Sequence, residues 1–261
     1  AKDEKVIKTI AGTLPPNSAV TYLSLGQALE AVASGVPVRV SCSGAPTGES
    51  PDLAAPALRG APLRFPVEDP AAIEELYVIG MDHSAAPDPV PVRCVSYQGL
   101  AFPSCYAGHE GTDFLLIGGF AAMDAGSAFA VAAAPGVVAE IEDGHYDRCH
   151  GNFMTATVDC DGHEMRANRV VVDHAGGLRT EYYHLMKGSI LVQPGQRVAC
   201  GERLARIGSS GRSSLPHLHL NLFEGGERRD PYAGPFSQPR SYWNSQPTVS
   251  GVLPAAVCAA P

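Results

Sequence analysis

Two histidines separated by one residue stand in an alternating apolar run near the end of the chain. His217 and His219 belong to the segment HLHLNLF, which follows Pro216. Successive side chains of a β-strand point to opposite faces, so both imidazoles would lie on one face, a few ångströms apart. Two such imidazoles can contribute to one metal or catalytic site. Two histidines on a solvated strand face would give the same pattern, and these residues alone leave both interpretations open.

A histidine and a carboxylate four positions apart form the second group. His109 and Asp113 flank Gly111, a residue at which the segment can turn so that both side chains reach one cation. Zinc in catalytic sites commonly takes three protein ligands from His and Asp or Glu and keeps its fourth position open. The sequence has no His-Glu-x-x-His motif, which excludes the zinc proteases that carry their ligands on a helix. Exposed turn residues would also explain the spacing.

The third group is the segment Arg179-Thr-Glu-Tyr-Tyr-His184-Leu. His184 ends a β-like run, and Tyr182 alternates with it, so we expect both on one strand face. There the hydroxyl of Tyr182 could serve as a hydrogen-bond donor to a substrate. A buried, hydrogen-bonded core histidine is the ordinary alternative for His184.

The order of these groups resembles a known family. The chain presents His-x3-Asp, then Tyr-x-His-Leu, then Gly-Ser-Ser-Gly-x-Ser-x-x-Pro-His-Leu-His, over about residues 100 to 225. This arrangement is similar to that of the lysostaphin and β-lytic (LytM-like) zinc endopeptidases, which cut peptide cross-links in bacterial peptidoglycan. The resemblance also includes the stretches GSAFAVAAAPGVVAEI and ILVQPGQRVACGERLARIGSSGRSSLPHLHL.

The resemblance implies a role for each residue of the three groups. His109, Asp113 and His219 would be the zinc ligands, with one Zn²⁺ per chain. His184 and His217 would stay unligated and act in catalysis, His217 as the base and His184 as the partner of the oxyanion. The chain departs from the family at Leu215, where a glycine is usual, and at Leu220-Asn221, where Phe-Glu is common. Both departures would alter the groove rather than the ligands.

The expected ligand set agrees with the chemistry of peptide hydrolysis. Two neutral imidazoles and one carboxylate leave Zn²⁺ with a net charge of about +1, enough to lower the pKa of bound water towards ~7. A nearby histidine, with an ordinary pKa of about 6.5, can accept that proton and pass it to the leaving amine. A second, protonated histidine can stabilise the oxyanion.

Short β-like runs separated by turn dipeptides dominate the sequence from residue 75 onward. Dipeptides such as Pro135-Gly136, Asp161-Gly162 and Gly225-Gly226 mark the turns. Without helices between the strands, this pattern predicts a mainly β protein with an antiparallel sheet. The family resemblance specifies this as the groove-forming sheet of the lysostaphin-like peptidase, the duplicated hybrid motif type. The expected strands are 114–117, 128–132, 137–141, 155–159, 170–173, 179–184 and 218–223.

The N-terminal part differs from the rest of the chain in composition. Residues 23–34 are expected to form a short helix, and residues 43–70 are rich in Pro, Ala and Gly. We therefore expect an N-terminal extension of mixed structure over 1–75, the peptidase domain over 76–244 and a C-terminal tail over 245–261. The resemblance implies that in some members of the family an N-terminal asparagine occupies the open zinc position. Asn17 would be that residue here. A purely structural extension is the alternative.

Composition limits the partners. The net charge is −8, and the 19 Lys and Arg residues form no long run, which argues against nucleic acid. No stretch is long and apolar enough for a membrane span, and we expect a monomer. Among the seven cysteines, Cys94/Cys105 and Cys149/Cys160 are spaced as local disulfides, which predicts an exported protein in an oxidising compartment. The first residues contain no signal-peptide core, so we expect the leader to be absent from this sequence.

Two other functions stay open from the sequence. A non-catalytic relative could use the same groove to bind peptidoglycan peptides or to activate another hydrolase. Such relatives, as the resemblance implies, tend to lack one or more zinc positions, whereas all five expected residues are present here. A structural zinc module is less favoured because a closed site needs a fourth protein ligand.

Overall fold

The computed structural model describes residues 63–85, 90, 92–152, 155, 157–247 and 252–259, with the side chains of 75–77 excepted. The chain divides into two units, Ala1–Ala54 and Ala55–Pro261, and the described residues belong to the second. The helix expected at 23–34, Asn17, Cys42 and most of the Pro-rich segment lie outside the described residues. No described helix is long and apolar enough to cross a bilayer.

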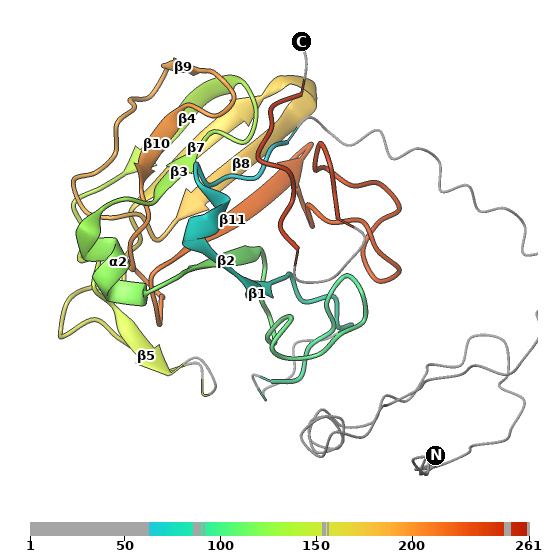
Figure 1. Ribbon diagram of the computed structural model, residues 1–261, viewed down its shortest axis with the longest axis horizontal. Helices are drawn as coiled ribbons and strands as arrows, with labels where there is room; N and C mark the ends of the chain where they lie inside the picture. Colours follow the sequence, from blue (N-terminus) through green and yellow to red (C-terminus); the bar gives the residue numbers. More distant parts are fainter. Residues whose placement is uncertain are drawn as a thin grey trace, which may run out of the picture. The chain divides into compact units, whose positions relative to one another are not determined.

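One large sheet organises the second unit (Figure 1). Its strands follow the order β1-β2-β11-β8-β7-β4-β9, with β12 paired to β11, and the pairs for which register is defined are antiparallel. The bounds are β1 (Ile73–Ile79), β2 (Thr112–Leu116), β4 (Gly136–Glu142), β7 (Arg169–His174), β8 (Leu178–Tyr183), β9 (Arg197–Val198), β11 (His217–Glu224) and β12 (Glu227–Arg229).

Two small sheets accompany it. One pairs β3 (Phe129–Val131) with β10 (Arg203–Arg206), and the other pairs β5 (His150–Asn152) with β6 (Thr157–Asp159). The seven strands expected from the sequence all coincide with observed strands to within a few residues. The prediction of a mainly β, antiparallel protein is confirmed.

The central strands have one face in the core and one face open. Along β11, Leu218, Leu220 and Leu222 are at most 1% exposed, whereas His219 and Phe223 on the opposite face are partly accessible. Because side chains alternate along a strand, His217 and His219 both lie on the open face. The leucines of the core face belong to one buried cluster that also contains Ala130 and Ala132 to Ala134.

A short helix was not expected from the sequence. Helix α2 (Gly119–Ala125) begins after Gly118 and ends at Gly126, both of which have a left-handed backbone. The Gly118-Gly119 dipeptide indicated a turn, and seven residues are too few for a clear helical period. The helix packs against the core through the buried side chain of Met123. Two 3-10 turns, η1 (Pro70–Ala72) and η2 (Ala175–Gly177), complete the helical elements among the described residues.

The ends of the described chain are joined through hydrogen bonds. The Leu63 N–H donates to the carbonyl of Tyr242, and the Phe65 N–H donates to the carbonyl of Ala255. Leu63 and Phe65 are fully buried, and β1 runs across position 75. The division into 1–75, 76–244 and 245–261 stays a prediction.

Three disulfides are present among the described residues. Cys94–Cys105 and Cys149–Cys160 are the two local bridges that the spacing predicts. The third, Cys200–Cys258, joins residues 58 positions apart, a separation too long to be recognised from local spacing. It links the segment after β9 to the C-terminal residues.

Candidate metal centre

Three side chains from two neighbouring strands and one loop meet on the open face of the sheet. His109 precedes β2, Asp113 lies in β2, and His219 lies opposite Asp113 in the β11–β2 register. Asp113 Oδ1 is 2.7 Å from His219 Nδ1 and 3.2 Å from His109 Nε2. The two imidazole nitrogens are 3.2 Å apart. All three residues thus offer one ligand atom within 4.8 Å of the others.

Hydrogen bonds behind the site fix which nitrogen each imidazole directs inward. His109 Nδ1 donates to the Gly80 carbonyl at 2.8 Å, so the neutral ring directs the lone pair of Nε2 to the centre. His219 Nε2 lies 2.9 Å from Asn221 Oδ1. The Asn221 amide group donates to Glu181 at 3.2 Å, which orients Oδ1 towards His219 and makes Nδ1 the inward atom.

This donor set fits zinc. With these tautomers, two nitrogen lone pairs and a carboxylate oxygen converge, and they repel one another unless a proton or a cation lies among them. His109 and Asp113 are only 3% and 4% exposed, so water screens the repulsion poorly. Two imidazoles and one carboxylate are a ligand set of catalytic zinc sites, with the fourth position left for water or substrate.

Gly111 provides the space that this arrangement needs. A Cβ at residue 111 would lie 2.6 Å from His219 Nε2, from Asn221 Oδ1 and from the Leu220 carbonyl oxygen. Each of these approaches is too short for a carbon atom, so any side chain would displace the imidazole. The glycine between His109 and Asp113 therefore serves close packing in addition to the turn expected from the sequence.

Two further imidazoles border the ligands. His217 Nδ1 is 2.7 Å from the Leu215 carbonyl, which leaves Nε2 facing Asp113 Oδ1 at 3.4 Å. His184 Nδ1 donates to the Ser210 carbonyl at 2.6 Å, which leaves its Nε2 free. The two rings are 4.5 Å apart, and the His184 ring is 5.7 Å from that of His219. The five residues singled out in the sequence thus form one site.

Burial and neighbouring charges shift the pKa values of Asp113, His217 and His184 in different directions. Burial alone would raise the pKa of Asp113, but the imidazoles of His109 and His217 hold that pKa well below its usual range. Burial would lower the pKa of His217, yet the Asp113 carboxylate outweighs this and raises it. Burial and the neighbouring imidazoles of His217 and His219 lower the pKa of His184 strongly. These opposite directions favour protonation of His217 over protonation of His184.

The prediction that Tyr182 contacts substrate is wrong. Its side chain is fully buried in the core, where the hydroxyl oxygen accepts a hydrogen bond from the Ala133 N–H at 2.8 Å. The cause lies in His184, whose φ of +63° breaks the strand after Tyr183. Strand alternation therefore does not extend to residue 184, and Tyr182 and His184 point to different faces. Tyr183 lies on the open face instead, with its ring 5.8 Å from that of His219.

Sequence reasoning also missed residues that surround the site. The Tyr106 ring stacks on His109 with centroids 4.2 Å apart. Burial and the Asp113 charge strongly raise the pKa of Tyr106, so its hydroxyl stays protonated. Asn221 alternates with His217 and His219 in HLHLN. This alternation could have identified Asn221 as a neighbour of the candidate metal ligands. The backbone acceptors Gly80 and Ser210 carried no signal because any residue type supplies a carbonyl.

The fold and the site together place a His, Asp, His group that could hold a metal ion on the open face of an antiparallel sheet. Comparison with known proteins agrees: the family described as Peptidase family M23 matches residues 107–231. The match covers 125 of the 261 residues, a little under half of the chain, and includes all five residues of the site. The resemblance seen in the sequence is confirmed.

Curated relatives match over a short segment. The chain is 43% identical over 60 residues to the peptidoglycan DD-endopeptidase ShyA of Vibrio cholerae serotype O1, and 40% identical over 60 residues to ShyB of the same organism. Each match covers 23% of this chain and 14% of the relative. The chain therefore spans only a small part of the length of these relatives.

Solved structures that are similar to part of the chain include the catalytic domain of lysostaphin from Staphylococcus simulans. It matches with a TM-score of 0.32 at 22% identity, over 51% of this chain and 82% of that chain. A zinc-containing peptidase from Vibrio cholerae matches with a TM-score of 0.33 at 22% identity, over 61% of this chain and 39% of that chain.

Proposed function

We propose that this protein is a zinc-dependent endopeptidase that hydrolyses peptide cross-links of bacterial peptidoglycan. The observation that carries the proposal is the convergence of His109 Nε2, Asp113 Oδ1 and His219 Nδ1 beside two imidazoles whose Nε2 atoms are uncommitted to backbone. Closed structural zinc sites have four protein ligands, whereas the described residues supply three. Bound zinc would polarise a peptide carbonyl and acidify a water molecule.

His217 is the residue we assign to proton transfer. Its Nδ1 proton is held by the Leu215 carbonyl, so the ring is oriented with Nε2 at the ligand cluster. The Asp113 charge that raises the pKa of His217 would be shared with the metal, which favours a neutral His217 able to accept a proton at Nε2. The same nitrogen can then return the proton to the leaving amine.

His184 is the residue we assign to the oxyanion. Its Nδ1 is held by the Ser210 carbonyl, and its strained backbone is maintained by the surrounding hydrogen bonds. Strain at a residue of this kind is common where a side chain must be aimed at a substrate. Once protonated, Nε2 would donate to the developing negative charge.

Peptidoglycan as the substrate rests on the family and on the curated relatives. ShyA and ShyB are described as peptidoglycan DD-endopeptidases, and the similarity of this chain to them supports the same polymer as its target. The three disulfides favour an oxidising compartment, which is where peptidoglycan lies. We accordingly propose an exported protein that acts as a monomer.

The test combines metal content with wall digestion. Zinc per chain would be measured by mass spectrometry, and release of muropeptides from purified sacculi would be measured in the same preparation. We expect one zinc per chain and new peptide termini, both lost in Asp113→Ala. Zinc without any new termini would favour the non-catalytic binding relative, and absence of bound zinc would contradict the proposal.

A further inference from the structure

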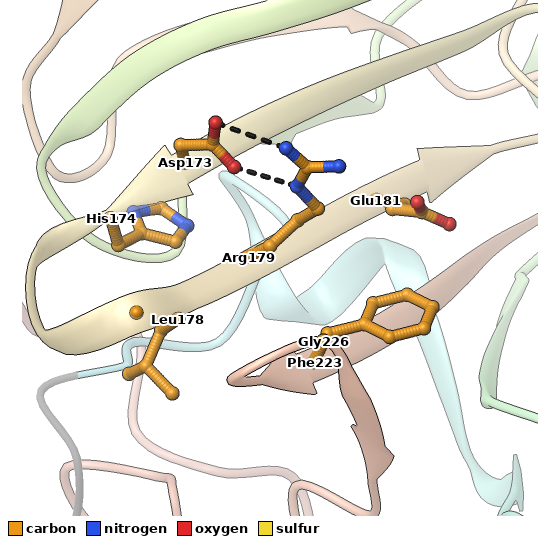
Figure 2. A pocket seen from close by; sticks show the side chains of 8 residues that line it. Asp173, His174, Leu178, Arg179, Glu181, Phe223 and Gly226 are labelled. Atoms are coloured by element: carbon orange, nitrogen blue, oxygen red, sulfur yellow. Dashed lines mark hydrogen bonds and ion pairs between the residues drawn. The ribbon is translucent and has the colours of Figure 1, made fainter.

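A pocket lies on the open face of the sheet at the end of β8 and β11 that is remote from the metal ligands (Figure 2). Its volume is about 460 Å³. Its lining residues come from β7, the β7–β8 turn, β8 and β11 with its turn to β12, and they are Asp173, His174, Gly177, Leu178, Arg179, Glu181, Phe223 and Gly226.

The strand register ties this pocket to the metal ligands. His219 pairs with Tyr183, and Phe223 pairs with Arg179, four residues further along β11. At about 3.3 Å per residue, the far wall lies roughly 13 Å from His219. Glu181 pairs with Asn221, only about 7 Å from the His219 position by the same rise. A peptide extended along the sheet would therefore place a side chain at Glu181 when its bond one or two residues away is at the metal.

Most charges on this face are already paired. Arg179 makes a two-pronged ion pair with Asp173, with distances of 2.6 and 3.1 Å. Arg169 pairs with Glu140 at 2.9 Å and Glu142 at 3.3 Å. Each guanidinium group is thus engaged by a carboxylate other than Glu181.

Glu181 is left without a cation. Its Oε2 accepts hydrogen bonds from the Tyr183 hydroxyl at 3.0 Å and from the Asn221 amide at 3.2 Å. Among the described residues, no Lys, Arg or His nitrogen lies within 4.0 Å of this carboxylate, and its Oε1 accepts no hydrogen bond. Glu181 is half-buried and held in place at one oxygen. The other oxygen is therefore available to a ligand.

The opposite wall is apolar. Phe223 faces Glu181 and Arg179 across the pocket in Figure 2. One side of the Phe223 ring is covered by Arg228, whose guanidinium carbon is 5.2 Å from the ring centroid. An aliphatic chain packed against the ring would lead a terminal amine towards Glu181. Arg169 and Arg179 interact with Glu181 only from beyond ion-pair distance. The pocket therefore combines a hydrocarbon wall with one carboxylate that is held in place and makes no ion pair.

We propose that this pocket binds the amine-bearing side chain of a diamino acid residue in the wall peptide, with Glu181 accepting a hydrogen bond from the ammonium group. The inference rests on the proposed function and specifies the substrate near the cleaved bond. Charge-assisted hydrogen bonds to a fixed carboxylate are about twice as strong as neutral ones, so the free amine should be distinguished from an uncharged chain of similar length. The pocket would contact the substrate residue that lies within about two positions of the cleaved bond.

The experiment uses two cross-linked peptides that differ only in lysine or norleucine at this position. Cleavage by the zinc-loaded full chain gives kcat/KM, and calorimetry gives the Kd of the product peptides. We expect a preference for lysine of about tenfold in both quantities, from the charge-assisted bond. Glu181→Gln, whose amide oxygen can still accept the hydrogen bond from Asn221, should bring both ratios close to one, and Glu181→Asp should restore part of the preference. Glu140→Gln, on the same face but paired with Arg169, should keep the wild-type ratio.

The outcomes separate this inference from the proposed function. Equal values for both peptides with wild-type protein would overturn the pocket assignment while leaving the peptidase intact. An equal loss for both peptides in Glu181→Gln, with the tenfold preference retained, would mean that Glu181 only positions Asn221 and His219. If neither peptide is cleaved, the proposed function fails. The product Kd values then decide the inference: a lysine preference abolished in Glu181→Gln supports it, and equal affinities overturn it.

Discussion

The two ends of β8 and β11 differ in burial although they belong to the same pair of strands. At the metal end, the side chains of His217 in β11 and of Asp113, which faces it from β2, are 10% and 5% exposed, and Nδ1 of His217 is occupied by a backbone carbonyl. At the pocket end, the Asp173 and Arg179 side chains are 49% and 41% exposed. Polar interactions are strong where water is excluded and weak where it is present. One sheet face can therefore hold the proposed reacting groups rigidly at one end and bind a flexible substrate at the other.

Removing a metal ligand should have the largest effect. Asp113→Ala or His219→Ala should lose zinc and lower kcat/KM by on the order of 10³-fold or more, because the proposed reaction depends on the metal. His184→Ala and His217→Ala should retain zinc and lower kcat by roughly 10² to 10⁴-fold, the range of general acid–base groups. Zinc content and kcat measured on each variant check this. Loss of zinc in His217→Ala with retention in His219→Ala would reverse the assignment within the pair.

Filling the space at Gly111 tests how tightly the metal end is packed. In Gly111→Ala the new carbon meets three atoms at 2.6 Å, including His219 Nε2, so the imidazole must move. We expect zinc affinity to fall by about 10 to 100-fold, as when the partner behind a ligand is lost.

Gly80→Ala is the matched control for this change. Gly80 also contacts His109, through its carbonyl, but its added carbon would come no closer than 3.5 Å to the Ser104 carbonyl oxygen. Competition with a zinc chelator gives the affinities of both variants. Similar affinities for the two would show that space at residue 111 is not what limits the site.

The disulfides should contribute more to stability the longer the loop they close, with the free energy growing as the logarithm of loop length. The chain-entropy estimate is about 3 kcal/mol for each of the two local bridges and about 4 kcal/mol for Cys200–Cys258. Paired Cys→Ser variants, compared by urea unfolding, should rank in that order. Cys94→Ser with Cys105→Ser should in addition weaken zinc binding, because this bridge lies in the segment that leads to His109. An effect of Cys149–Cys160 on zinc larger than that of Cys94–Cys105 would contradict this.

The exposed ion pair should matter least. The hydrogen bond and charge of Arg179 lower the pKa of Asp173, so the pair stabilises the fold above the unfolded pKa of about 4, and this contribution is lost as pH falls through the lowered pKa. Because both side chains are solvated, Asp173→Asn should cost about 1 kcal/mol or less at pH 7. Unfolding at pH 7 and at pH 2 checks the sign, and the difference between wild type and variant should shrink at the lower pH. A loss well above 1 kcal/mol would mean that this end of the sheet is more rigid than its exposure indicates.

Strand alternation explains both what was predicted at the site and what was not. It placed His217 and His219 on one face, because β11 is regular from end to end. The same rule failed for Tyr182, because the left-handed backbone of His184 interrupts β8. A positive φ at a non-glycine residue depends on the contacts that maintain it, and those contacts come from distant parts of the chain.

Residue type and spacing by themselves singled out the His-x-His and His-x3-Asp groups, the antiparallel strands and the two local disulfides, whereas the ligand roles came from the family resemblance. These features depend on neighbours within about a dozen positions, so the linear order contains them. Only the tertiary structure decided that Gly80, Ser210 and Leu215 hold the imidazoles, that Cys200 meets Cys258, and that Glu181 stays without a cation. Each depends on segments that are far apart in sequence and are brought together by packing of the sheet, which no local pattern specifies.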